Sequence, residues 1–270
     1  MKIQAVKTSY DQNNVYKAQK TKYNMSFGNS FCSSVSSVDF LSEMFNLVKK
    51  YVQSLQKESL VKNPAPLLKT DEIGEELLKK IASVELRKML SKPSERIMYI
   101  ITGRSGSGKS TIVRNLRLDK DFYVPDADNV KRLLPGYKEK GLNYVHRASY
   151  AINRTNLSEA LSRGTNCVIQ TTTTFENMDE MISEAKRNGY SDIKIVHVDV
   201  KEDIAIERCK KRAEKKGLKT NTDYIKQRKY IDDIVETYKN PEKGVNEIIV
   251  FDNNSTFPEL KKVIVVKYWV

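Results

Sequence analysis

The sequence has no long apolar run and only three cysteines. No stretch approaches the roughly 18–20 apolar residues that cross a bilayer, which excludes a membrane-spanning protein. The first residues contain no continuous apolar segment, so we expect no secretory signal. Cys32, Cys167 and Cys209 are far apart and odd in number. They show no metal-binding spacing and predict a reducing, cytoplasmic environment.

Acidic residues are also under-represented, since 34 Asp and Glu face 47 Lys and Arg, for a net charge of +13. Residues 201–230 alone hold eleven basic and five acidic side chains. Such a cluster indicates either a polyanionic partner, such as nucleotide phosphates or nucleic acid, or a solvated helix face. The hydrophobic fraction of 39% over 270 residues is too high for a wholly disordered chain and is enough for a packed core.

The distribution of polar and apolar residues along the chain predicts three parts. Residues 1–36 are polar, without sustained periodicity, and we expect a flexible tail. Residues 37–95 show apolar residues at helical spacing, interrupted near Pro64 and Pro66, and predict a helical appendage. Its second helix is expected to begin near Thr70 and to pack its apolar stripe on the domain that follows.

From residue 96 to 270, short apolar runs alternate with helical patterns. The expected strands are 97–102, 122–125, 166–171, 193–200, 247–252 and 263–268, and the expected helices are 109–117, 143–163, 176–188, 202–216 and 222–238. This alternation is typical of βαβ units around a mainly parallel sheet, so the fold class is predicted to be α/β.

A glycine-rich segment directly follows the first expected strand and opens the first helix. It fits the pattern G-x-x-x-x-G-K-[ST] at all four fixed positions, and its nucleotide-binding residues would be Gly103, Arg104, Ser105, Gly106, Ser107, Gly108, Lys109, Ser110 and Thr111. Strand, loop and helix in this order predict a P-loop kinase-type or NTPase-type sheet flanked by helices, preceded by the small helical appendage.

The residue types of this loop suit a triphosphate. Glycines let the backbone wrap closely and turn successive N–H groups inward. Lys109 can reach the β- and γ-phosphates as a catalytic residue, and the hydroxyl of Ser110 can ligate Mg²⁺. The predicted cofactors are therefore ATP and Mg²⁺.

Two carboxylates follow the run 122–125, at the edge of the sheet where open α/β folds bind ligands. Asp128 could accept the proton of an acceptor hydroxyl and also contact the metal shell. Alternatively, Asp126 caps the next helix and Asp128 lies in its first turn.

Four features follow one another along the chain: the glycine-rich loop, the Asp126-x-Asp128 pair, the segment 133–137 and the segment His146–Ser149. Together they resemble the zeta toxin family of P-loop kinases over about residues 96–240. Members of this family use ATP and Mg²⁺ to phosphorylate a hydroxyl of UDP-N-acetylglucosamine. The resemblance implies that Asp128 is the catalytic base and that Arg208 stabilises the transferred phosphate. The sequence leaves open whether the protein has an antitoxin-like protein partner.

The basic cluster gains a role from this resemblance. Positions 208, 212, 215 and 219 share one helix face, and Arg212 would join Arg208 in a catalytic lid over the triphosphate. The expected substrate contacts are Thr171, Thr172 and Arg147.

Two positions depart from the family pattern. Gln170 stands where strand three of toxin members carries an acid, and Asn221 stands near their second lid arginine. Both departures concern the sugar-nucleotide acceptor and leave ATP binding untouched.

Three functions fit the sequence. The first is a kinase that moves the ATP γ-phosphoryl group to a hydroxyl of a small phosphorylated or nucleotide-linked metabolite. The second is a nucleic-acid 5′-end kinase, suggested by the net charge, although aromatic residues do not alternate with basic ones as single-strand binding requires. The third is a non-catalytic ATP-binding module whose apolar stripe at residues 41–55 docks a partner.

Overall fold

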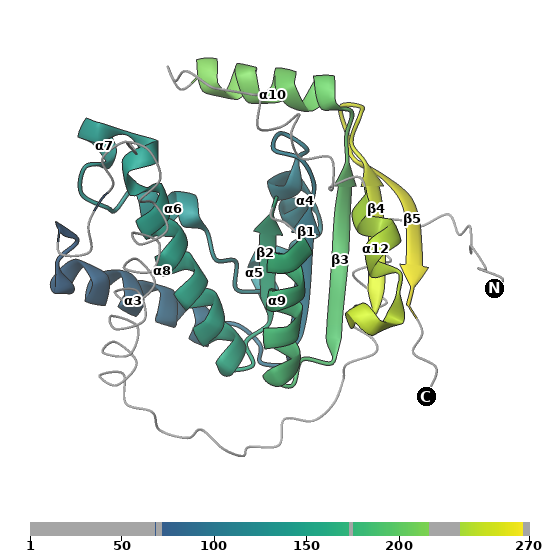
Figure 1. Ribbon diagram of the computed structural model, residues 1–270, viewed down its shortest axis with the longest axis horizontal. Helices are drawn as coiled ribbons and strands as arrows, with labels where there is room; N and C mark the ends of the chain where they lie inside the picture. Colours follow the sequence, from purple (N-terminus) through teal and green to yellow (C-terminus); the bar gives the residue numbers. More distant parts are fainter. Residues whose placement is uncertain (1–67, 69–71, 173–174, 216–232, 267–270) are drawn as a thin grey trace. The chain divides into compact units, whose positions relative to one another are not determined.

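The computed structural model describes residues 68, 72–172, 175–215 and 233–266. These residues form two compact units (Figure 1). The sheet unit comprises Ser94–Phe122 and the described part of Asn166–Val270, and the helical unit comprises the described part of Gly28–Pro93 together with Tyr123–Thr165. The predicted tail, the predicted helix before Pro64 and the lid positions 216–221 lie outside the described residues.

The sheet unit is built on five strands in the order β2-β1-β3-β4-β5 (Figure 1). The strands are β1 (Ile97–Thr102), β2 (Cys167–Thr171), β3 (Asp192–Asp199), β4 (Glu247–Asp252) and β5 (Glu259–Val265). All neighbouring pairs are parallel except β4 and β5, which form an antiparallel hairpin. The predicted α/β fold with a mainly parallel sheet is therefore confirmed.

The sequence of β1 explains its central place. Five of its six residues are buried, because a parallel strand covered on both faces is apolar throughout rather than alternating. Thr102 pairs in register with Thr171 on β2 and with His197 on β3. The carboxyl ends of these strands therefore meet at one edge of the sheet, where α/β folds bind ligands.

Helices of the sheet unit connect these strands. They are α4 (Lys109–Asn115), α5 (Leu118–Asp121), α9 (Phe175–Arg187), α10 (Glu202–Glu214) and α12 (Ile234–Tyr238), with a 3-10 turn η3 at Pro241–Lys243. In Figure 1, α10 runs across the edge at which β1 and β3 end. The predicted helix at 109–117 is thus observed as α4, and α5 is a separate short helix just beyond it. Only the end of the predicted helix at 222–238 lies within the described residues.

The helical unit has a core of its own. It contains α3 (Glu75–Leu90), α6 (Ala127–Lys131), α7 (Tyr137–Lys140) and α8 (Leu142–Ser162). Leu78 and Ile81 of α3 pack with Val130 of α6 and with Val145 and Ile152 of α8. The predicted apolar stripe of α3 therefore packs on the following part of the chain, as expected, although the helix begins at Glu75.

The predicted strand at 122–125 is wrong, since the described sheet does not include it and Tyr123 makes only an isolated bridge. Pro125 has no N–H to donate to a ladder. The apolar side chains serve packing instead: the ring of Phe122 lies edge-on to Tyr99, with centroids 5.3 Å apart, and Tyr123 is buried in the helical unit.

The last strand begins earlier than predicted, at Glu259 rather than 263. The domain boundaries at residues 36 and 95 stay predictions. No helix within the described ranges is both long and apolar enough to cross a membrane.

Candidate nucleotide-binding site

The glycine-rich loop connects β1 to α4 in the sheet unit, as predicted from its flanking patterns. Gly103, Gly106 and Gly108 have φ angles of 143°, 84° and 95°, which side-chain-bearing residues rarely adopt. A Cβ atom on Gly103 would lie 2.6 Å from the carbonyl oxygen of Val198, and one on Gly106 would lie 2.4 Å from that of Ala205. The loop therefore requires glycine both for its backbone angles and for its close contact with β3 and α10.

Two polar side chains follow the last glycine. The Lys109 ammonium donates to the carbonyl oxygens of Gly103 and Arg104, at 2.9 and 3.0 Å. The hydroxyl of the exposed Ser110 donates to Oε1 of Gln170, at 2.7 Å. The Lys109 ammonium is thus bonded to the backbone of the loop, and the Ser110 hydroxyl is bonded to a side chain near the end of β2.

Other loop residues are fixed by α10. Arg104 is buried, and its guanidinium lies 3.7 Å from the carboxylate of Glu202. The thiol of Cys209 lies 3.6 Å from the hydroxyl of Ser105. Thr111 donates its backbone N–H to Gly108 at 2.9 Å in the first turn of α4.

Both predicted lid arginines are on α10. Arg208 donates from Nη2 to the carbonyl oxygen of Ser255, at 2.9 Å, whereas Arg212 is exposed and lies 3.9 Å from the sulfur of Cys209. The structure therefore brings Arg208 and the loop after β4 together. Lys219, the outermost position of the predicted lid face, lies outside the described residues.

The loop after β4 contributes a residue that sequence reasoning missed. Asn253 is only 5% exposed and donates from Nδ2 to the carbonyl oxygen of Ser107, at 2.6 Å. No local pattern marks Asn253; the sequence offers only an Asn-Asn pair directly after an expected strand, at the end where open α/β sheets bind ligands.

The predicted substrate contacts divide between the two units. Thr171 ends β2 and Thr172 follows it, both half-buried near Gln170 in the chain. Arg147 lies on α8 of the helical unit. Their contacts with a substrate stay predictions.

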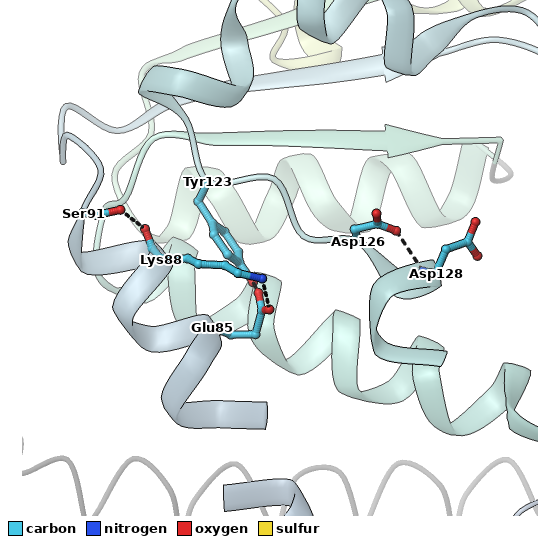
Figure 2. Close-up of polar contacts among 6 residues, drawn as sticks. All are labelled: Glu85, Lys88, Ser91, Tyr123, Asp126 and Asp128. Atoms are coloured by element: carbon cyan, nitrogen blue, oxygen red, sulfur yellow. Dashed lines mark hydrogen bonds and ion pairs between the residues drawn. The ribbon is translucent and has the colours of Figure 1, made fainter. Parts of the chain in front are cut away.

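Asp126 and Asp128 open α6 in the helical unit (Figure 2). Asp126 is the N-cap, and its carboxylate accepts the backbone N–H of Asp128 at 2.8 Å. The side chain of Asp128 is 72% exposed and forms an ion pair with Lys131 at 2.7 Å. Figure 2 shows the Asp128 carboxylate pointing away from that of Asp126. The cap proposed for Asp126 is confirmed, and the catalytic role of Asp128 stays a prediction.

His146 on α8 belongs to the same electrostatic neighbourhood. Its side chain is exposed, but neighbouring atoms displace part of its water, and this desolvation lowers the pKa of His146 below 6.5. The charges of Lys131 and Arg147 lower the pKa further, while Asp128 acts in the opposite direction. The lowered pKa favours the neutral form of His146, whose neighbours Asp128 and Lys131 form an ion pair.

The described part of the chain contains no group of three or more His, Cys, Asp or Glu side chains arranged to hold a metal ion. The oxygen atoms of Ser110 and Gln170 are hard donors of the kind that Mg²⁺ accepts together with phosphate oxygens. The residues present thus fit a magnesium ion that is held mainly by its nucleotide.

A mainly parallel sheet, a glycine-rich phosphate loop after β1 and a basic helix across the carboxyl edge define a P-loop protein of the kinase type. The family model described as Zeta toxin matches residues 82–257. The chain therefore belongs to the zeta toxin family.

Solved structures share this fold. A chain from the PezAT chromosomal toxin–antitoxin system of Streptococcus pneumoniae is 18% identical, with a TM-score of 0.52 over 68% of this chain and 81% of that one. A chain of the AvrRxo1-ORF1:-ORF2 structure with ATP is 13% identical, with a TM-score of 0.51 over 71% of this chain and 67% of that one. No curated protein sequence gives a significant match.

Proposed function

We propose that the protein is an ATP-dependent kinase that transfers the γ-phosphoryl group to a hydroxyl of a small phosphorylated or nucleotide-linked metabolite. The observation that carries this proposal is the glycine-rich loop, which wraps around the Lys109 ammonium between β1 and α4. Membership of a toxin-kinase family and the structural similarity to a protein solved with ATP support ATP as the donor.

The loop binds the phosphates of ATP through its backbone N–H groups and Lys109. To reach a phosphate, the ammonium exchanges its two carbonyl partners, Gly103 and Arg104, for phosphate oxygens. This exchange keeps Lys109 hydrogen-bonded throughout, so its charge is never left without a partner.

Ser110 would hold a magnesium ion together with the phosphates of the nucleotide. Because the Ser110 hydroxyl gives its proton to Gln170, both lone pairs of its oxygen are available to a cation. When bound, the ion neutralises charge on the β- and γ-phosphates. The contact of Asp128 with the metal shell stays a prediction from the sequence.

Asp128 receives the proton of the acceptor hydroxyl. Its carboxylate is exposed and forms an ion pair with Lys131, and its backbone N–H is held by the Asp126 cap. Arg208, with Arg212 further along α10, then offsets the negative charge that spreads over the transferred group.

The acceptor that the family implies is UDP-N-acetylglucosamine. Thr171, Thr172 and Arg147 are the residues that we assign to its recognition. Gln170, near the end of β2, is a neutral amide where the family pattern has an acid, and its side chain is held against Ser110.

The toxin–antitoxin system named for the Streptococcus pneumoniae structure supports a protein partner that controls this activity. We assign both the kinase and that partner to the cytoplasm, in line with the three scattered cysteines.

The test is incubation with ATP labelled at the γ-phosphate and a panel of nucleotide sugars, nucleosides and oligonucleotides with 5′-hydroxyl ends. We expect label in a small-molecule product, and no label with the Lys109→Ala variant. Label found on oligonucleotide ends alone would identify a nucleic-acid kinase, and ATP binding without any labelled product would identify a binding module.

A further inference from the structure

Asn253 is the first residue after β4 and is in contact with the phosphate loop. Its side-chain Nδ2 donates to the carbonyl oxygen of Ser107 at 2.6 Å, and its backbone N–H donates to Asp199 at the end of β3, at 2.9 Å. A Cβ atom on Gly108 would lie 2.3 Å from Nδ2, so only glycine permits this approach. Asn253 is thus a buried amide that lies at the ends of β3 and β4 and bonds to the phosphate loop.

This contact fixes a peptide plane of the loop. A trans peptide is planar, and its C=O and N–H groups point in opposite directions. With the carbonyl of Ser107 bonded to Asn253, the N–H of Gly108 faces the opposite side of that plane. A rotated plane would instead present a carbonyl oxygen there, and that oxygen would repel a phosphate.

We propose that Asn253 is a positioning residue for phosphate binding: it holds the Ser107–Gly108 peptide so that the Gly108 N–H donates to the phosphates of the nucleotide. This inference rests on the proposed ATP-binding function. In this proposal the loop after β4 sets the orientation of the Gly108 N–H, which the sequence of the phosphate loop alone does not fix.

Neighbouring residues of the same loop support this role. Asn254 accepts the backbone N–H of Lys201 at the start of α10, at 2.7 Å, and the carbonyl of Ser255 accepts from Arg208 at 2.9 Å. The segment 253–255 therefore contacts the phosphate loop, the first turn of α10 and a lid arginine. It sets their positions relative to one another within the sheet unit.

Asn253→Ala and Asn253→Asp test the proposal. Neither can donate to Ser107, and the aspartate adds a negative charge beside the loop. Dissociation constants for ATP and for inorganic tripolyphosphate are measured by calorimetry, together with the thermal midpoint of the ligand-free protein. We expect both ligands to bind roughly 10-fold to 100-fold more weakly to Asn253→Ala, by the same factor, since one hydrogen bond to a charged group is lost. The loss should be larger for Asn253→Asp.

Asn188→Ala is the matched control, because Asn188 also donates from its amide to a backbone carbonyl of the sheet unit, that of Glu184 at 2.9 Å. Its affinity for ATP should stay within about twofold of the wild type. Folded Asn253 variants that bind both ligands like the wild type would overturn the proposal, as would a loss confined to ATP, which would mean a contact with the nucleoside. A wild-type protein that does not bind ATP would refute the proposed function instead.

If the Asn253 variants do not fold, hydrogen exchange of the Asn253 side-chain amide in the wild-type protein decides the question. Slow exchange that slows further with ATP supports the positioning role. Exchange at the rate of a free amide, with ATP bound, overturns it.

Discussion

The hydroxyl of Ser110, at the start of α4, donates to the side-chain carbonyl of Gln170, near the end of β2, across 2.7 Å. The contact joins two parallel neighbours at the carboxyl edge of the sheet, since β1 and β2 pair in register up to Thr102 and Thr171. It places a neutral amide, rather than a carboxylate, beside the hydroxyl to which we assign Mg²⁺.

Gln170→Glu should therefore change the metal dependence of ATP binding. The added negative charge beside Ser110 repels the phosphates, and a bound cation offsets that repulsion. Without Mg²⁺, we expect ATP to bind about tenfold more weakly than to the wild type, for a charge separation on the order of 10 Å. Calorimetric titration with and without Mg²⁺ measures this difference. Gln170→Ala is the control for loss of the contact alone, and equal Mg²⁺-free affinities of the Glu variant and the wild type would contradict the arrangement.

Lys109→Ala should abolish phosphoryl transfer without unfolding the protein. The variant loses the ammonium that donates to Gly103 and Arg104 in the glycine-rich loop, and we expect a rate loss of roughly 100-fold or more. Rates with labelled ATP and a circular-dichroism melting curve test both parts. Lys120→Ala, an exposed lysine of α5 in the same unit, is the control and should retain its rate. Full turnover by Lys109→Ala would contradict the assignment of the glycine-rich loop to catalysis.

Tyr123→Phe should destabilise the helical unit. The buried carboxylate of Glu85 accepts from the Tyr123 hydroxyl at 2.7 Å and from Lys88 at 2.6 Å (Figure 2). Removing the hydroxyl leaves a buried carboxylate oxygen without that donor, at a cost of about 1–3 kcal/mol in the free energy of unfolding. Urea denaturation measures the loss. Ser91→Ala, which deletes an exposed bond to the carbonyl of Lys88, should change the same quantity by less than about 0.5 kcal/mol. Equal effects of the two variants would contradict the importance of the buried contact.

Stability should fall as the pH drops below about 6.5, partly because of His146. Its pKa is lower in the folded protein than in the unfolded chain, so the unfolded chain takes up a proton first and gains stability from it. The contribution of His146 is complete above the unfolded pKa and is lost as the pH falls through the folded one. His146→Asn should therefore show a smaller loss between about pH 8 and about pH 5 in urea denaturation. An identical pH dependence of variant and wild type would show that His146 has an ordinary pKa.

The sequence predicts the sheet well because its signals are local and strong. The strands 97–102 and 247–252 match the structure, since each is a short apolar run bounded by polar residues. The glycine-rich loop is equally predictable. Its backbone angles and close contacts at three positions permit only glycine, so the glycine pattern in the sequence follows from the loop's geometry.

Other features depend on contacts between distant residues. The run 122–125 has the composition of a strand, but its aromatic residues pack on Tyr99 and bond to Glu85 instead of entering the ladder. Asn253 could not be recognised either, because its partner Ser107 lies 146 residues earlier in the chain. Only the parallel order of β1, β3 and β4 brings that amide to the loop.

The most direct test of the kinase account compares Asp128→Asn with Asp126→Asn. Each variant replaces one carboxylate of α6 by an amide, and asparagine caps a helix as well as aspartate does, so Asp126→Asn should preserve both the helix and the activity. For each variant, the ATP dissociation constant and the rate of label transfer to the identified acceptor are measured together. We expect Asp128→Asn to keep the wild-type ATP affinity within about threefold and to lose transfer by roughly 100-fold or more. Wild-type transfer by Asp128→Asn would contradict the role of that carboxylate as the base.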